Sequence, residues 1–92
     1  MFRLIGVRPY KDMRGHRFVF VAETPVFLRR GRGLPRVFVP KGGQVEVSLV
    51  NLPPALGGFE AAVIYNDTFI AFHRSPTLTA EEALNRTLVL KK

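Results

Sequence analysis

The stretch "QVEVSLVNL", Gln44–Leu52, decides the fold class because apolar and polar residues alternate along most of it. Val45, Val47 and Leu49 fall on one face of an extended strand, and the polar residues between them fall on the other. This period of two indicates a half-buried β-strand. The segments on either side of it can be compared with this strand pattern.

Runs of strand length recur on both sides of this stretch. Most are rich in β-branched or aromatic residues, and proline, glycine or asparagine separates them. The expected strands are Phe2–Arg8, Arg17–Ala22, Val26–Leu28, Arg36–Val39, Gln44–Leu52, Phe59–Tyr65, Thr68–His73 and Arg86–Leu90. The second of these is a continuous apolar run, which predicts a strand buried on both faces. Asn66 and Asp67 both tolerate positive φ, so they predict a two-residue hairpin turn.

One helix is expected near the C-terminus. In Thr79–Glu82 the Thr79 hydroxyl can accept from the Glu82 amide, while the Glu82 carboxylate reaches back to the Thr79 amide. Asn85 is expected to end this helix after one or two turns. The sequence thus predicts a single domain over residues 1–92. Its class is all-β, a small antiparallel β-barrel or sandwich of about seven or eight short strands with one short helix.

Positive charge is concentrated in the first half of the chain. The chain holds 14 basic and 7 acidic residues, a net charge of +7. Residues 1–44 carry ten bases and two acids, a net charge of +8, whereas residues 45–92 carry four bases and five acids, a net charge of −1. Such asymmetry predicts that one part of the chain meets an anionic partner.

The strongest candidate site is "VFLRRGRGLPRVFVPKGG", Val26–Gly43, which has five bases and no acid. Its glycines allow the backbone to approach a ligand closely. Its guanidinium groups offer paired donors that match a phosphate. We expect phosphate contacts from Arg29, Arg30, Arg32, Arg36 and Lys41.

A second candidate patch lies near "RGHRFVFV", Arg14–Val21. This segment superficially resembles the RNP1 motif of RNA-recognition modules, but His16 and Val21 stand where that motif has stacking aromatics. The module also has two substantial helices that this chain lacks, so we do not expect that fold. Phe18 and Phe20 are expected in the core. The patch itself combines two rings that could stack on bases with two guanidinium groups, at Tyr10, His16, Arg14 and Arg17.

Several kinds of chemistry find no support in the sequence. The chain has no cysteine, its two histidines lack zinc-site spacing, and no phosphate-binding loop or nucleophile motif occurs. We therefore expect no metal, no cofactor and no enzymatic activity. No apolar run is long enough to cross a bilayer, so we expect a cytoplasmic protein without membrane contact. Scarce thermolabile residues suggest a thermophilic source.

Three function classes remain open. The favoured one is a small RNA-binding component of a ribonucleoprotein particle such as the ribosome. It would bind structured RNA in preference to duplex DNA and would contact other proteins of the same assembly. The first alternative is a structural β-sandwich interaction module of the viral coat or decoration type. The second is a DNA-compacting chromatin protein.

Overall fold

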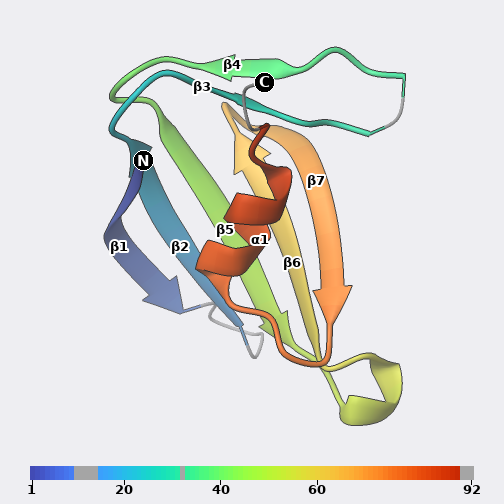
Figure 1. The fold of residues 1–92 in the computed structure, drawn as a ribbon. Helices are drawn as coiled ribbons and strands as arrows, with labels where there is room; N and C mark the ends of the chain where they lie inside the picture. Colours follow the sequence, from blue (N-terminus) through green and yellow to red (C-terminus); the bar gives the residue numbers. More distant parts are fainter. Residues whose placement is uncertain (10–14, 32, 90–92) are drawn as a thin grey trace.

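The computed structural model describes residues 1–9, 15–31 and 33–89. It is mostly antiparallel β-structure with one short C-terminal helix, which confirms the predicted fold class (Figure 1). The elements in chain order are β1 (Phe2–Pro9), β2 (Gly15–Ala22), β3 (Val26–Leu28), β4 (Val37–Val39), β5 (Gln44–Asn51), the 3-10 turn η1 (Pro54–Leu56), β6 (Phe59–Tyr65), β7 (Thr68–Ser75) and α1 (Ala80–Thr87).

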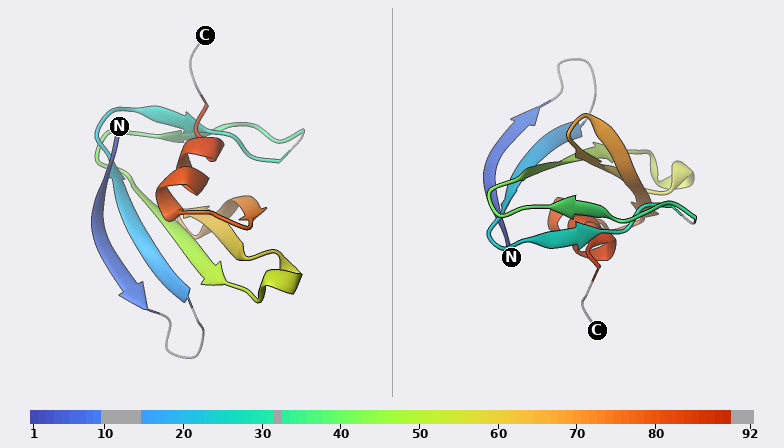
Figure 2. Two further views of the ribbon diagram at one scale, coloured as in Figure 1. Left: turned by 60° about the horizontal axis from the view of Figure 1, so that its bottom comes forward. Right: turned by 90° about the horizontal axis from the view of Figure 1, so that it is seen from above.

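Five strands form one antiparallel sheet in the order β1-β2-β5-β6-β7. Strands β3 and β4 form a separate hairpin, inserted in the chain between the neighbouring strands β2 and β5. This hairpin lies across one end of the sheet. Helix α1 lies on one face of the sheet (Figures 1 and 2). The sheet does not close into a barrel, so β1 and β7 are its edge strands.

The core lies where one sheet face, the inner side of the hairpin and α1 meet. Val45 and Val47 of β5 are fully buried there, as their alternation predicted. Leu28 from β3, Val39 from β4 and Leu84 from α1 complete the centre, and each is at most 1% exposed. Burying each such side chain stabilises the fold by roughly 1.5–3 kcal/mol. The hairpin is therefore held to the sheet through its own apolar side.

Strand β2 corrects one expectation, because it is buried on one face and not on both. Phe20 and Ala22 are buried in the core, and Phe18 is half-buried against it. Val19 and Val21 point to the opposite face and are only half-buried. The reason is that α1 lies on one face of the sheet (Figure 2). A continuous apolar run cannot by itself show which face will be covered.

The predicted hairpin turn is confirmed, and the predicted capping box is confirmed for one of its two hydrogen bonds. Asn66 and Asp67 form the β6–β7 turn with φ values of 55° and 61°. The Thr79 hydroxyl accepts from the Glu82 amide at 3.0 Å and so caps α1. The Glu82 carboxylate instead accepts a bond from Arg86, at 3.0 Å.

The predicted closing strand Arg86–Leu90 is wrong, because α1 continues through Asn85 to Thr87. Thr87 is 1% exposed, and its hydroxyl donates to the Ala83 carbonyl at 2.9 Å, which favours another helical turn. Of the two described residues after the helix, Leu88 forms an isolated antiparallel bridge to Leu28. Tertiary burial of the last turn outweighed the local β-propensity of this segment.

Candidate nucleic-acid interface

The β3–β4 hairpin carries the basic loop that the sequence singled out. Its ladder runs from the pair Val26–Val39 to the pair Leu28–Val37. Arg29 comes directly after β3, and Arg36 comes directly before β4. Continuing the register by one pair would therefore set these two arginines opposite one another. Both are exposed. The Arg29 amide donates to the Thr87 carbonyl at 2.8 Å, which holds the start of the loop against the end of α1.

Elsewhere in the structure, arginines are neutralised by glutamates. These ion pairs are Arg3–Glu23 (3.1 Å), Arg17–Glu46 (3.6 Å), Arg74–Glu60 (3.3 Å) and Arg86–Glu82 (3.0 Å). Within residues 1–9, 15–31 and 33–89, the side chains without such a partner are Arg8, Arg29, Arg30, Arg36 and Lys41. Four of these five cations belong to the hairpin and its turns. Most of the unneutralised positive charge of the described residues is therefore gathered at one end of the sheet, with Arg8 of β1 as the exception.

The structure divides the predicted basic residues between the two ends of the hairpin. Arg29, Arg30 and Arg36 belong to the loop that joins β3 to β4. Lys41 lies beyond the other end, in the turn before β5, where the Gly42 amide donates to the Ala22 carbonyl at 2.8 Å. Arg32 lies outside the described residues. The arginines thus form one group, and Lys41 stands apart from them.

The two described residues of the second predicted patch, His16 and Arg17, are not brought to this surface. Tyr10 and Arg14 lie outside the described residues. Arg17 forms an ion pair with Glu46. His16 lies in β2 and not in a turn, and its ring centroid is 6.1 Å from that of Phe18. His16 and Arg17 belong to the start of β2, and that end of the strand is at the opposite end of the sheet from the hairpin (Figure 1).

Exposed aromatic side chains are a feature that the sequence analysis missed. Phe27 and Phe38 are cross-strand partners on the hairpin, 47% and 50% exposed, with ring centroids 5.3 Å apart. A short two-stranded ladder is marginal alone, and such a cross-strand pair strengthens it. Phe69 and Phe72 of β7 are 54% and 45% exposed, with ring centroids 6.2 Å apart.

A cleft of about 470 Å³ lies between the basic loop and β7. Arg29, Arg30 and Leu34 line it from the loop side, and Phe69 and Phe72 line it from the strand side. The Nε atom of Arg30 is enclosed and has no hydrogen-bond partner among the described residues. The cleft thus combines unpaired cations with exposed rings.

His73 and Thr87 lie at the α1 side of this cleft. The His73 Nε2 atom is 2.8 Å from the Thr87 hydroxyl, whose hydrogen is already donated to the Ala83 carbonyl. His73 must therefore donate through Nε2–H. Burial lowers the pKa of His73 below 6.5, and the charge of Arg86 lowers it further. A neutral imidazole is thus favoured here.

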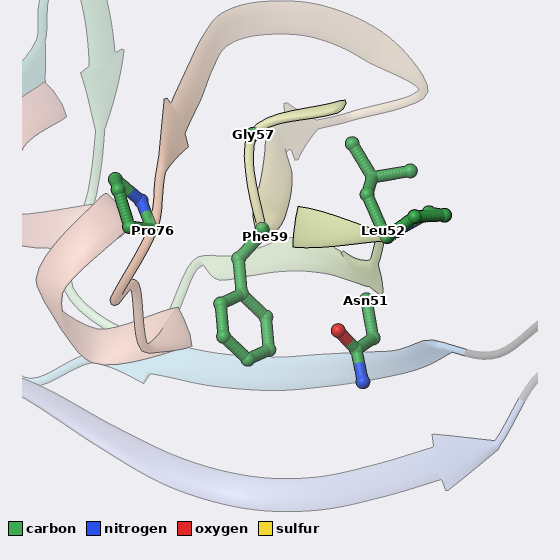
Figure 3. Close-up of a pocket in the computed structure, with 7 residues that line it drawn as sticks. Asn51, Leu52, Gly57, Phe59 and Pro76 are labelled. Atoms are coloured by element: carbon green, nitrogen blue, oxygen red, sulfur yellow. The ribbon is translucent and has the colours of Figure 1, made fainter. Parts of the chain in front are cut away.

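Two other cavities lack this combination of groups. The larger, of about 630 Å³, lies beside the η1 turn and is lined by Asn51, Leu52, Phe59 and Pro76 among others, with no charged side chain (Figure 3). Another, of about 370 Å³, opens between β1, β2 and the start of α1. Its lining is mostly apolar, and its one charged residue is Glu81. Of the three, only the cleft beside the basic loop offers arginines to an anion.

No protein-family model, curated protein or solved structure matches this chain. Within the described ranges, no helix is long and apolar enough to cross a membrane. Those same ranges contain no cluster of histidine and acidic side chains with the geometry of a metal site. The functional argument therefore depends on the charge and shape of the surface described above.

Proposed function

We propose that this protein is a nonenzymatic RNA-binding component of a ribonucleoprotein particle, and that its basic hairpin contacts phosphates. One observation carries the proposal. Four described glutamates, Glu23, Glu46, Glu60 and Glu82, neutralise arginines elsewhere, while the described cations of the hairpin form no ion pair with a described acidic side chain. The contacts are assigned to Arg29, Arg30, Arg36 and Lys41, and Arg32, which lies outside the described residues, is a further candidate from the sequence.

The arrangement of the arginines favours a phosphate ligand. Like charges directly opposite one another in a ladder destabilise it. Arg29 and Arg36 would face each other in this way, and no described glutamate relieves them. A phosphate would relieve this repulsion, and a guanidinium group can donate two parallel hydrogen bonds to it. An anion supplied by a partner would therefore reduce the charge repulsion within the hairpin.

The neighbouring rings favour RNA over duplex DNA. Phe69 and Phe72 are exposed beside the unpaired Arg29 and Arg30. Unstacked bases, which structured RNA presents in loops and bulges, can stack on such rings. An intact DNA duplex keeps its base faces covered and would use only the cations.

Fluorescence anisotropy tests the proposal with a labelled RNA stem-loop and a DNA duplex of equal length, each across a salt series. The first variant is R29A/R30A/R36A, which removes three unpaired cations. The matched control is R3A/R8A/R17A, which removes the same charge from β1 and β2, outside the hairpin and the cleft. We expect the first variant to bind RNA more weakly and to reduce the slope of log affinity against log salt by roughly two to three. We expect the control to retain most of the wild-type slope.

Three results would contradict the proposal. Equal losses in both triple variants would mean that net charge, and not the hairpin, governs binding. Tighter binding of duplex DNA would favour a chromatin protein. No binding of either probe at about 50 mM salt, together with concentration-dependent oligomers, would favour a self-assembling coat module.

A further inference from the structure

Phe69 and Phe72 share a sheet face because of an irregularity in β7. Residues three apart in a regular strand point to opposite faces. The register of β6 and β7 pairs Ile64 with Phe69, Val63 with Ala71 and Ala62 with Phe72. Ile70 is therefore an extra residue, a β-bulge, and it is 4% exposed. Bulges of this kind redirect side chains and are frequent beside binding sites.

The exposure of these two rings has no structural explanation in the described chain. The rings of Phe27 and Phe38 hold a short hairpin together, but Phe69 and Phe72 lie on an edge strand already paired over its length with β6. A regular strand would have placed only one of the two rings on this face. The bulge instead sets both beside the basic loop, where they line the 470 Å³ cleft.

The cleft suits a nucleotide in its charge and in its size. Arg29 and Arg30 line it without ion-pair partners among the described residues, and the Arg30 Nε atom is enclosed without a hydrogen bond. The guanidinium carbon of Arg74 lies over the Phe72 ring, 5.9 Å from its centroid, so a cation already lies against this aromatic surface. A volume of this size lies within the range of small-molecule sites.

We propose that this cleft receives an unpaired nucleotide of an RNA strand. Its base stacks against Phe69 and Phe72, and its phosphate binds Arg29 and Arg30. The inference rests on the proposed function, and it names the single-stranded segment as the part of the RNA that is recognised. Aromatic rings accept any base face, so the site selects for unpaired bases and not for a sequence.

The test compares a single-stranded 12-nucleotide RNA with a duplex RNA of the same length, both labelled, by anisotropy. The variant F69L/F72L removes the aromatic faces but keeps exposed apolar side chains. The matched control F27L/F38L alters the other exposed ring pair, outside the cleft. We expect F69L/F72L to bind the single strand about 5-fold to 100-fold more weakly, with unchanged duplex affinity and salt slope. We expect the control to bind both probes as the wild type does.

The outcomes separate this inference from the proposed function. One outcome would overturn the stacking site alone. In it, F69L/F72L binds the single strand with wild-type affinity, while R29A/R30A/R36A still binds RNA more weakly than the wild type. Loss of single-strand affinity in F27L/F38L and not in F69L/F72L would place the stacking on the hairpin and would also overturn it. Failure of the wild-type protein to bind either RNA would overturn both proposals. Circular dichroism of each variant checks that the fold is retained.

Discussion

Leu28 of the basic hairpin and Leu88 after the helix form an isolated antiparallel bridge. On either side of it the Arg29 amide donates to the Thr87 carbonyl at 2.8 Å, and the Val89 amide donates to the Phe27 carbonyl at 2.9 Å. These backbone contacts tie the start of the basic loop to the end of α1. They set the loop beside β7 and so create the cleft.

We therefore expect Leu28→Ala to destabilise the protein strongly. Leu28 is fully buried between the hairpin and the rest of the core, and a leucine-to-alanine change at such a site costs about 2–5 kcal/mol. Urea unfolding followed by circular dichroism measures the change. The control is Leu34→Ala in the same loop, where the side chain is 52% exposed and the change should stay below about 0.5 kcal/mol. Similar values for both would mean that the hairpin is not part of the core.

Arg36→Glu should stabilise the fold while it weakens RNA binding. Continuing the register one position past the last pair, Leu28–Val37, would set Arg36 opposite Arg29, so the substitution would replace like charges with opposite charges, which is worth about 0.2–1 kcal/mol. The melting temperature at low salt measures the gain in stability, and anisotropy measures the loss of RNA affinity. Arg36→Gln should give part of the gain, because it removes repulsion without adding attraction. A lower melting temperature in both variants would show that Arg36 is structural.

His73 should make stability depend on pH. Its pKa in the folded state lies below 6.5, lowered by burial and then by Arg86. Below about pH 6.5 the unfolded chain binds a proton that the folded chain resists, so the free energy of unfolding falls as pH falls towards the folded-state pKa. Above that range the effect vanishes. Arg29 and Arg30 line the same cleft as His73, and their positive charges do not favour protonation of His73.

Urea unfolding at about pH 7.5 and at about pH 5.5 tests this dependence. His73→Gln keeps a side-chain donor for Thr87 but cannot titrate, so it should lose less stability on acidification than the wild type. His16→Gln alters the exposed histidine and serves as the control. An identical loss in wild type and His73→Gln would contradict the assignment.

Gly58→Ala should be strongly destabilising. Gly58 has a φ of +92°, and an added Cβ would lie 2.8 Å from the Cα atom of Pro76. Backbone strain of this kind costs about 1–3 kcal/mol, and the steric overlap adds to it. Gly6→Ala is the matched control, since an added Cβ there meets no atom within 4 Å. We expect Gly6→Ala to change the free energy of unfolding by less than about 0.5 kcal/mol.

Local pattern alone was enough for most of the individual elements of this protein, though not for the end of α1. The alternation around Val45 and Val47 indicated the central strand, and Asn66–Asp67 marked the turn because both residues tolerate positive φ. The Thr79 hydroxyl marked the start of α1. The basic loop was also visible, since a run of arginines without acids needs no structure to be recognised. Each of these signals depends on residues within a few positions of one another.

Only the tertiary structure decided which cations remain unneutralised and what stands beside them. The glutamates that neutralise Arg3 and Arg74 are 20 and 14 residues away in the sequence, so their pairing depends on strand order. The bulge at Ile70 arises in the pairing of β6 with β7, and it alone brings Phe69 and Phe72 to one face. The last turn of α1 formed because Thr87 is buried against distant strands, against the local preference of its segment. Contacts between residues far apart in the chain carry no periodic signal, and the cleft is built from them.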